Sequence, residues 1–337
     1  MKKIILYIFL IAVLVACEEN NSLPAIKPDV ITEKTINDTD DPAIWVNPKD
    51  ASKSIVFGTD KETNGAIYAF DLDGKIIPEK TIRNIKRPNN VDVAYDFKVN
   101  DSTTVDVIAF TEREQQQIRL YSVPDMKPLD NGGFKVFADA TEPEFNLPMG
   151  IALYKSPKTS KLYAVVSRKT GPLENYLYQY EMLHDSTGIH SKLVRKFGKF
   201  SGKKEIEAIA VDNELGFIYY SDEQHCIRKY AAEPTASNEE VACFGSDKFQ
   251  ADIEGIAIAK TSKKNGYIIV SNQQKGEFNL FDRQTNEFIK AVNLSTVETD
   301  GCEVTTVPLG GKFPNGLFVA MNDSKEFYFY DLKKIIE

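Results

Sequence analysis

The chain has 337 residues, a formal net charge of −8 and 42% hydrophobic residues. This composition excludes a disordered chain and a membrane protein with several spans, and the length allows one large domain or two average ones. The acidic balance argues against nucleic acid as a partner, because phosphate backbones select basic surfaces, and it favours a metal cation. Four cysteines and three histidines are few for zinc chemistry.

The N-terminus has the pattern of an export signal. An apolar run over residues 4–16 follows two lysines, and it is too short to span a bilayer. The run ends in Leu-Val-Ala-Cys, which resembles the cleavage site of bacterial lipoproteins. We predict a signal peptide over residues 1–16, a lipid anchor on Cys17 and a polar tether over residues 17–28, rather than a buried N-terminal helix. The protein would then be an exported lipoprotein, held at a membrane on its periplasmic or outer side.

Export implies an oxidising compartment, in which disulfides persist. Three cysteines follow the signal: Cys226, Cys243 and Cys302. Cys226 and Cys243 fall on two predicted neighbouring strands and are candidates for a disulfide. We favour the alternative that all three are small buried hydrophobic residues.

The rest of the chain repeats one pattern six times. Each repeat holds an apolar strand, a turn, a second apolar strand that ends in polar residues, and a third strand rich in aromatic residues. The equivalent positions in the six first strands are Ile44, Val93, Ile151, Ile209, Ile256 and Thr305. Their spacing of 47–58 residues is typical of a β-propeller, in which each repeat forms a four-stranded blade.

We therefore predict an all-β, six-bladed β-propeller that forms one domain over residues 29–337, with a β-sandwich as the alternative fold. The last repeat ends after its third strand, at Asp331. Residues 29–36 are predicted to supply the missing fourth strand, since this pairing closes the ring and removes an exposed edge.

Polar residues gather at one phase of the repeat. In a propeller the first strands line the central channel, so the starts of the first strands and the ends of the second strands face the same end. The starts of the first strands carry Asp40, Asp41, Asn89, Asn90, Asp92, Glu205, Glu207, Asp252, Glu254, Asp300 and Glu303. The ends of the second strands carry Asp60, Lys61, Glu112, Arg113, Arg168, Lys169, Asp222, Glu223, Gln273, Asn322 and Asp323.

So many carboxylates at one channel mouth repel one another unless cations lie among them. Carboxylate oxygens without histidine or cysteine select hard ions such as Ca²⁺. Acids for a metal beside basic residues for an anion are what a metal-bridged phosphate site requires. The alternative is a set of ordinary polar loop residues. The motifs of histidine and cysteine phosphatases, a Gly-x-Ser-x-Gly elbow and a phosphate-binding loop are absent from the sequence.

Two stretches at this mouth resemble the β-propeller phytases, a calcium-dependent six-bladed family. Residues 40–45, Asp-Asp-Pro-Ala-Ile-Trp, match its opening signature, and residues 89–93, Asn-Asn-Val-Asp-Val, match its second. The similarity covers residues 38–323. The resemblance implies a 3-phytase, a phosphoric monoester hydrolase. Such an enzyme releases inorganic phosphate from phytate (myo-inositol hexakisphosphate) by attack of a calcium-bound water, without a covalent enzyme intermediate.

The resemblance also implies roles for individual residues. The catalytic carboxylates would be Glu207, Glu223, Asp252 and Glu254. The calcium ligands would be Asp40, Asp41, Asn90, Asp92, Glu207, Glu223, Asp252, Glu254 and Asp300, of which Asp40, Asn90 and Asp92 would mainly stabilise the fold. The phosphate-binding residues would be Lys61, Arg113 and Lys169, with Gln273 and Asn322 at a second phosphate.

Two positions depart from the family pattern. The family often has two successive lysines where this chain has Lys61 and Glu62, and often a tyrosine where this chain has Met149. Two other functions stay open: a calcium-dependent phosphoesterase with another substrate, and a non-enzymatic propeller that binds a ligand. We expect a monomer whose partners are a small-molecule substrate and, through Cys17, a membrane.

Overall fold

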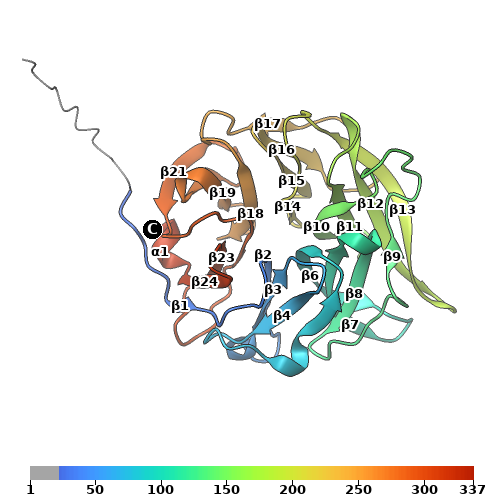
Figure 1. The fold of residues 1–337 in the computed structure, drawn as a ribbon, viewed down its shortest axis with the longest axis horizontal. Helices are drawn as coiled ribbons and strands as arrows, with labels where there is room; N and C mark the ends of the chain where they lie inside the picture. The colour runs from blue at the N-terminus through green and yellow to red at the C-terminus, as the bar shows by residue number, and fades with distance from the viewer. Residues whose placement is uncertain (1–22) are drawn as a thin grey trace, which may run out of the picture.

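The structure, a computed structural model, describes residues 23–337. The predicted signal peptide, the lipid anchor at Cys17 and the first part of the tether lie outside the described residues. Six four-stranded antiparallel sheets stand around a central channel (Figure 1), which confirms the predicted six-bladed, all-β propeller. No helix within residues 23–337 is long and apolar enough to cross a membrane.

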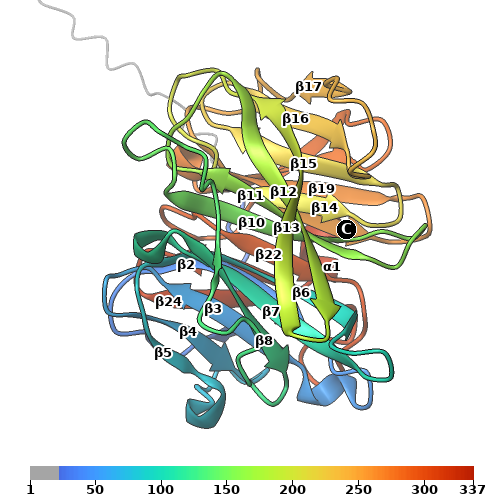
Figure 2. The same ribbon diagram turned by 90° about the vertical axis from the view of Figure 1, so that its right-hand side faces the viewer.

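The first five blades each use four consecutive strands. Blade one is β2 (Thr39–Trp45), β3 (Ile55–Asp60), β4 (Gly65–Phe70) and β5 (Ile82–Ile85). Blade two is β6 (Pro88–Lys98), β7 (Thr104–Glu112), β8 (Gln117–Val123) and β9 (Phe134–Lys135). Blade three is β10 (Pro148–Lys155), β11 (Leu162–Arg168), β12 (Glu174–Asp185) and β13 (Gly188–Lys199), and Figure 2 shows its long outer hairpin.

Blade four is β14 (Ile209–Asp212), β15 (Phe217–Asp222), β16 (Cys226–Ala231) and β17 (Ala242–Phe244). Blade five is β18 (Ile253–Lys260), β19 (Gly266–Asn272), β20 (Glu277–Asp282) and β21 (Phe288–Asn293). Blade six is β22 (Cys302–Thr305), β23 (Leu317–Asn322), β24 (Glu326–Asp331) and β1 (Val30–Ile31). Short 3-10 helices are η1 (Ala51–Lys53), η2 (Pro78–Lys80), η3 (Arg113–Gln115) and η4 (Gln273–Lys275), and α1 (Lys333–Ile336) follows blade six.

The second strands are continuous apolar runs because both of their faces are buried. Side chains alternate between the two faces of a strand. In β7, Val107 and Ala109 enter the core shared with blade three, whereas Ile108 and Phe110 enter the core shared with blade one. Each blade therefore lies between two apolar layers, and its stability depends on both neighbours.

The N-terminal strand joins the last blade. Val30 pairs with Phe329 and Ile31 with Tyr328, so β1 lies antiparallel to β24. The paired stretch is shorter than the predicted residues 29–36, but Thr32 N also donates to Phe327 O at 3.0 Å. The first and last described strands thus share one sheet, which leaves no gap in the ring (Figure 1).

The prediction that the three later cysteines are unpaired was wrong for two of them. Cys226 in β16 and Cys243 in β17 form a disulfide, with Cα atoms 5.7 Å apart. Cys243 faces Arg228, two residues along β16 from Cys226, and the Cα separation of the two cysteines lies within the range that a disulfide spans. Cys302 is buried and unbonded, as predicted.

Val30→Asp tests the closing strand. Val30 packs in the core between blades six and one, whereas Ile31 on the opposite face of β1 is 49% exposed. We expect V30D to lower the melting temperature, because burial of such an apolar side chain contributes about 1.5–3 kcal/mol and a buried unpaired carboxylate adds a further penalty. The matched variant I31D should melt close to wild type in the same circular dichroism experiment. Equal melting of V30D and wild type would show that this strand does not hold the ring closed.

Candidate active site

The second strand of every blade ends in three residues with separate tasks. The six triplets are 59–61, 111–113, 167–169, 221–223, 271–273 and 321–323. The first residue is a serine or threonine in five of them, and in blades two, three and five its hydroxyl donates to the segment that begins the next blade. Thr59 and Ser221 instead bond to the start of the inner strand of their own blade. Thr111 Oγ1 donates to the carbonyl of Met149 at 2.6 Å, and Ser167 Oγ donates to the carbonyl of Ile206 at 2.6 Å. These bonds join neighbouring inner strands at the channel mouth.

The second residue of a triplet anchors the segment that leads into the blade. Asp60 accepts hydrogen bonds from the backbone of Asn37 and Asp38, at 3.0 and 2.7 Å. Asn322, predicted to bind substrate, occupies this anchoring position. Its Oδ1 accepts from Val297 N at 2.9 Å, and its Nδ2 donates to Ser324 at 2.6 Å. The side-chain bonds of Asn322 therefore run to neighbouring loops and not to the carboxylates of the mouth.

Four of the six inner strands begin with β-bulges. In β2, Asp40 and Asp41 both oppose Thr59, and the register shifts in the same way at the starts of β6, β10 and β18. A bulge re-aims side chains locally. Consequently Asp40 contacts Lys61 at the mouth, whereas Asp41 lines the channel and accepts a hydrogen bond from Val91 N at 3.0 Å.

Seven carboxylates gather at the mouth, and we call them the mouth cluster. They are Asp40, Glu205, Glu207, Glu223, Asp252, Glu254 and Asp300. Carboxylate oxygens of Glu205, Glu207 and Glu223 lie within 4.8 Å of one another, as do those of Glu223, Asp252 and Glu254. Glu223 belongs to both groups. The four predicted catalytic carboxylates are therefore brought together.

Three predicted phosphate-binding residues contact the same cluster. Lys61 Nζ lies 3.1 Å from Asp40 Oδ1 and 3.3 Å from Asp300 Oδ2. Gln273 Nε2 donates to Asp300 Oδ1 at 2.6 Å, and Lys169 forms an ion pair with Glu205. These side chains come from blades one, three, four, five and six, which the ring brings together across the mouth.

Arg113 and Met149 occupy another part of the mouth. Arg113 Nη2 contacts Met149 Sδ, and the Arg113 Nε is buried without a hydrogen-bond partner. Burial lowers the pKa of Arg113, although the nearby charge of Glu207 opposes this. The guanidinium thus has an unused donor beside the acids.

Lys204 is a site residue that sequence reasoning missed. Its Nζ lies 2.7 Å from Asp252 Oδ2, 3.0 Å from Glu223 Oε2 and 3.9 Å from Glu254 Oε1. The one available signal was its position, directly before the polar run that starts blade four. Lys204 lies in a loop that follows β13, so no repeat phase marks it.

The acids of the mouth cluster have divergent pKa values. Burial raises the pKa of Asp40 and of Glu254 well above the ordinary range, and it raises the pKa of Glu223 to about 8. Burial also acts to raise the pKa of Glu207, but the charges of Lys61 and Arg113 outweigh it and lower the pKa below its usual value. Perturbation of this kind marks a functional site when the groups share a cleft.

The residues of the mouth cluster fit a divalent cation. Both carboxylate oxygens of Glu223 and the Oε2 of Glu254 are buried and accept no hydrogen bond. Lys204 and Glu223 form an ion pair without hydrogen-bond geometry, so the Glu223 oxygens still accept no hydrogen bond. Buried polar atoms require partners, and an all-oxygen donor set suits a hard cation.

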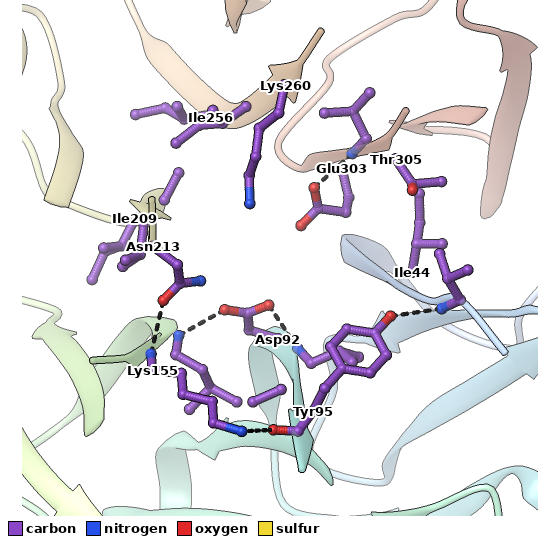
Figure 3. Close-up of a pocket in the computed structure, with 18 of the residues that line it drawn as sticks. Ile44, Asp92, Tyr95, Lys155, Ile209, Asn213, Ile256, Lys260, Glu303 and Thr305 are labelled. Carbon is purple, nitrogen blue, oxygen red and sulfur yellow. Dashed lines mark hydrogen bonds between the residues drawn. The ribbon is translucent and has the colours of Figure 1, made fainter. Parts of the chain in front are cut away.

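Inside the mouth, the inner strands enclose a cavity of about 750 Å³. Three predicted calcium ligands, Asp41, Asn90 and Asp92, line this cavity and not the mouth. Figure 3 shows Asp92, Lys260 and Glu303 directed into it from three different strands. Asp92 Oδ2 accepts from Leu153 N at 2.6 Å, and the buried Asn90 Oδ1 has no hydrogen-bond partner.

Comparison with known proteins decides the family. A family model described as Phytase matches residues 10–327. The chain belongs to the phytase family. A 3-phytase from Bacillus subtilis (strain 168) is 32% identical over 299 residues, which cover 84% of this chain and 74% of that protein. Among solved structures, the WD40 β-propeller domain of Doa1 matches 85% of this phytase-family chain and 77% of its own length, with a TM-score of 0.51 and 8% identity, and this likeness shows the fold alone.

Glu303→Gln tests the penalty for burying acids in the channel. Burial, and then the charge of Asp92, raise the pKa of Glu303 from its usual 4.5 to about 8. An acid whose pKa is higher in the folded state weakens the fold progressively as the pH rises from its unfolded to its folded value. With a chelator present, the melting temperature of E303Q should exceed that of wild type by a difference that grows between pH 4.5 and 8 and then levels off. A difference that is constant across this pH range would contradict the shift.

Proposed function

We propose that this phytase-family enzyme is a calcium-dependent 3-phytase that releases inorganic phosphate from phytate. The observation that carries the proposal is the mouth cluster, where buried carboxylate oxygens without donors lie beside Lys61, Arg113 and Lys169. Family membership and the name of the B. subtilis relative support the substrate.

Glu207, Glu223, Asp252 and Glu254 would hold the cation, with Asp40 and Asp300 at the edge of the same site. A bound divalent cation would polarise the phosphoryl group and lower the pKa of water. Asn89 Nδ2 donates to Glu207 Oε1 at 3.0 Å and so orients that carboxylate. Because Lys61 and Arg113 lower the pKa of Glu207 despite its burial, this ligand stays ionised near neutral pH.

Lys61, Arg113 and Lys169 would bind the substrate phosphate. In phosphomonoester hydrolysis, water adds to phosphorus, the phosphorus–oxygen bond to the inositol ring breaks, and the departing oxygen takes up a proton. The three cationic side chains donate to the phosphoryl oxygens and offset the charge that develops there. Lys61 and Lys169 each pair with a carboxylate, and Arg113 keeps one donor without a partner. A bound phosphate would therefore take the place of contacts that already position these side chains.

A phosphoesterase with another substrate is the second candidate, and Met149 favours it. Met149 is 1% exposed and contacts Arg113, so the site offers a thioether where a hydroxyl donor would suit a phosphate. Glu62 does not replace a second lysine either, because its Oε1 accepts from Thr63 N at 2.8 Å and it is exposed. Both positions reduce the donors available to a highly phosphorylated substrate.

We also propose that the protein is an exported lipoprotein, with a signal peptide over residues 1–16 and a lipid on Cys17. The basic start, the apolar run and the cysteine support this localisation. The Cys226–Cys243 disulfide adds support, because such bonds persist in oxidising compartments.

The assay of phosphate release from phytate tests the activity. Wild type should release phosphate with calcium and lose this activity with excess chelator. Glu207→Gln removes one ligand charge, and we expect kcat/KM to fall by on the order of 100-fold. Glu239→Gln, an exposed glutamate on blade four, is the matched control and should behave as wild type. Calcium-dependent hydrolysis of a simpler phosphate ester but not of phytate would favour the second candidate. No hydrolysis of any phosphate ester would contradict both candidates.

Cys17→Ser tests the anchor. In a bacterial host that processes lipoproteins, the wild-type chain should partition into detergent and carry a mass increase on an N-terminal cysteine. C17S should lack this mass and keep the uncleaved residues 1–16, because the substitution removes both the lipidated residue and part of the cleavage site. Aqueous partition of the wild-type protein would overturn the proposed anchoring.

A further inference from the structure

Lys204 fills the space between three carboxylates of the mouth cluster. Its ammonium lies within ion-pair distance of Asp252, Glu223 and Glu254. The side chains of Glu223 and Glu254 are nearly inaccessible to solvent and that of Asp252 is 11% exposed, whereas that of Lys204 is 37% exposed. The ammonium therefore enters the cluster from the solvent side, at the place where the acids face one another.

The backbone around Lys204 is anchored on both sides. Ser201 donates from N and Oγ to the carboxylate of Asp222, at 2.9 and 2.7 Å. On the other side, Glu223 N donates to Glu205 O at 3.2 Å. Because the flanking residues are fixed and its side chain is partly exposed, Lys204 can move its ammonium into solvent by side-chain rotation alone.

One ammonium does not satisfy this site. An ammonium carries a single charge and three donors. When all three acids are ionised they carry three negative charges, and Glu223 Oε1 and Glu254 Oε2 have no partner although they are buried. An ion of higher charge and coordination number would reach oxygens that Lys204 leaves unpaired.

We propose that Lys204 is a tethered counter-ion that holds the metal ligands together in the metal-free protein and leaves when a divalent cation binds. This inference rests on the proposed function, since it takes the mouth cluster as the cation site. Binding is then an exchange, in which the cation enters and the ammonium moves to solvent. By linkage, the exchange weakens the cation's apparent affinity and stabilises the metal-free fold.

Lys204→Met and Lys203→Met form a matched pair for the test. Lys203 is the neighbouring exposed lysine, and its Nζ donates to the carbonyl of Gln224 at 2.8 Å, away from the carboxylates. Calcium affinity is measured by calorimetry, and melting temperature is measured over a series of free calcium concentrations. The melting series is readable even where the metal-free variant is only partly folded. Lys204→Arg keeps the charge and serves as the conservative variant.

We expect K204M to bind calcium about tenfold more tightly than wild type. This factor lies at the lower end of the usual range for coupled binding events, because Lys204 is partly exposed and solvent weakens its ion pairs. K204M should also melt at a lower temperature in chelator, because the three acids then lack a counter-ion. K203M and K204R should follow wild type in both measurements. None of these readouts depends on turnover, so a failure to hydrolyse phytate leaves the inference standing.

Two results would overturn the inference. If wild type binds calcium and K204M binds it with equal or lower affinity, Lys204 is not exchanged for the metal, and the proposed metal site survives. If neither wild type nor K204M binds calcium, the cation site itself is absent, and the proposed function fails together with the inference.

Discussion

The junction at the end of each second strand is the constraint on which the rest of the molecule depends. In blades two, three and five a serine or threonine hydroxyl there reaches the start of the next blade, and the residue after it anchors the segment that enters the blade. These side chains thus supply hydrogen bonds to backbone groups at the mouth, and a substitution that removes one of them leaves a backbone group without a partner. In five of the six triplets the third residue faces the channel mouth, and these five are Lys61, Arg113, Lys169, Glu223 and Gln273. Fold and site share these positions, which explains why polar residues recur at one phase.

Concentration of acids at the mouth sets the second constraint. Seven carboxylates in a poorly solvated space cannot all be ionised without cations, because burial and mutual repulsion both disfavour the charged form. The chain's own lysines lie among these acids: Lys61 between Asp40 and Asp300, Lys169 beside Glu205, and Lys204 beside Asp252, Glu223 and Glu254.

Much of this arrangement could be predicted from the sequence. The spacing of the repeats and their apolar runs depend on local periodicity, so they indicated six blades correctly. The phase of the acids placed Glu207, Glu223, Asp252 and Glu254 at one end, and the structure brings them together. The disulfide was misjudged, because spacing alone does not show which side chains of two adjacent strands approach each other. Asn322 was assigned to substrate, although its place in the triplet makes it an anchor.

By itself, the sequence determined the propeller, the number of blades and the set of residues near the mouth, since each follows from patterns that repeat along the chain. Only the tertiary structure decided which of these residues lie close to one another. Asp40 and Asp41 are adjacent in sequence, yet a bulge sends one to the mouth and the other into the channel. Lys61 and Asp300 lie 239 residues apart and meet because the ring closes. Lys204 lies in a loop that has no equivalent in the other repeats, so the periodicity of the sequence could not reveal its contacts with the acids.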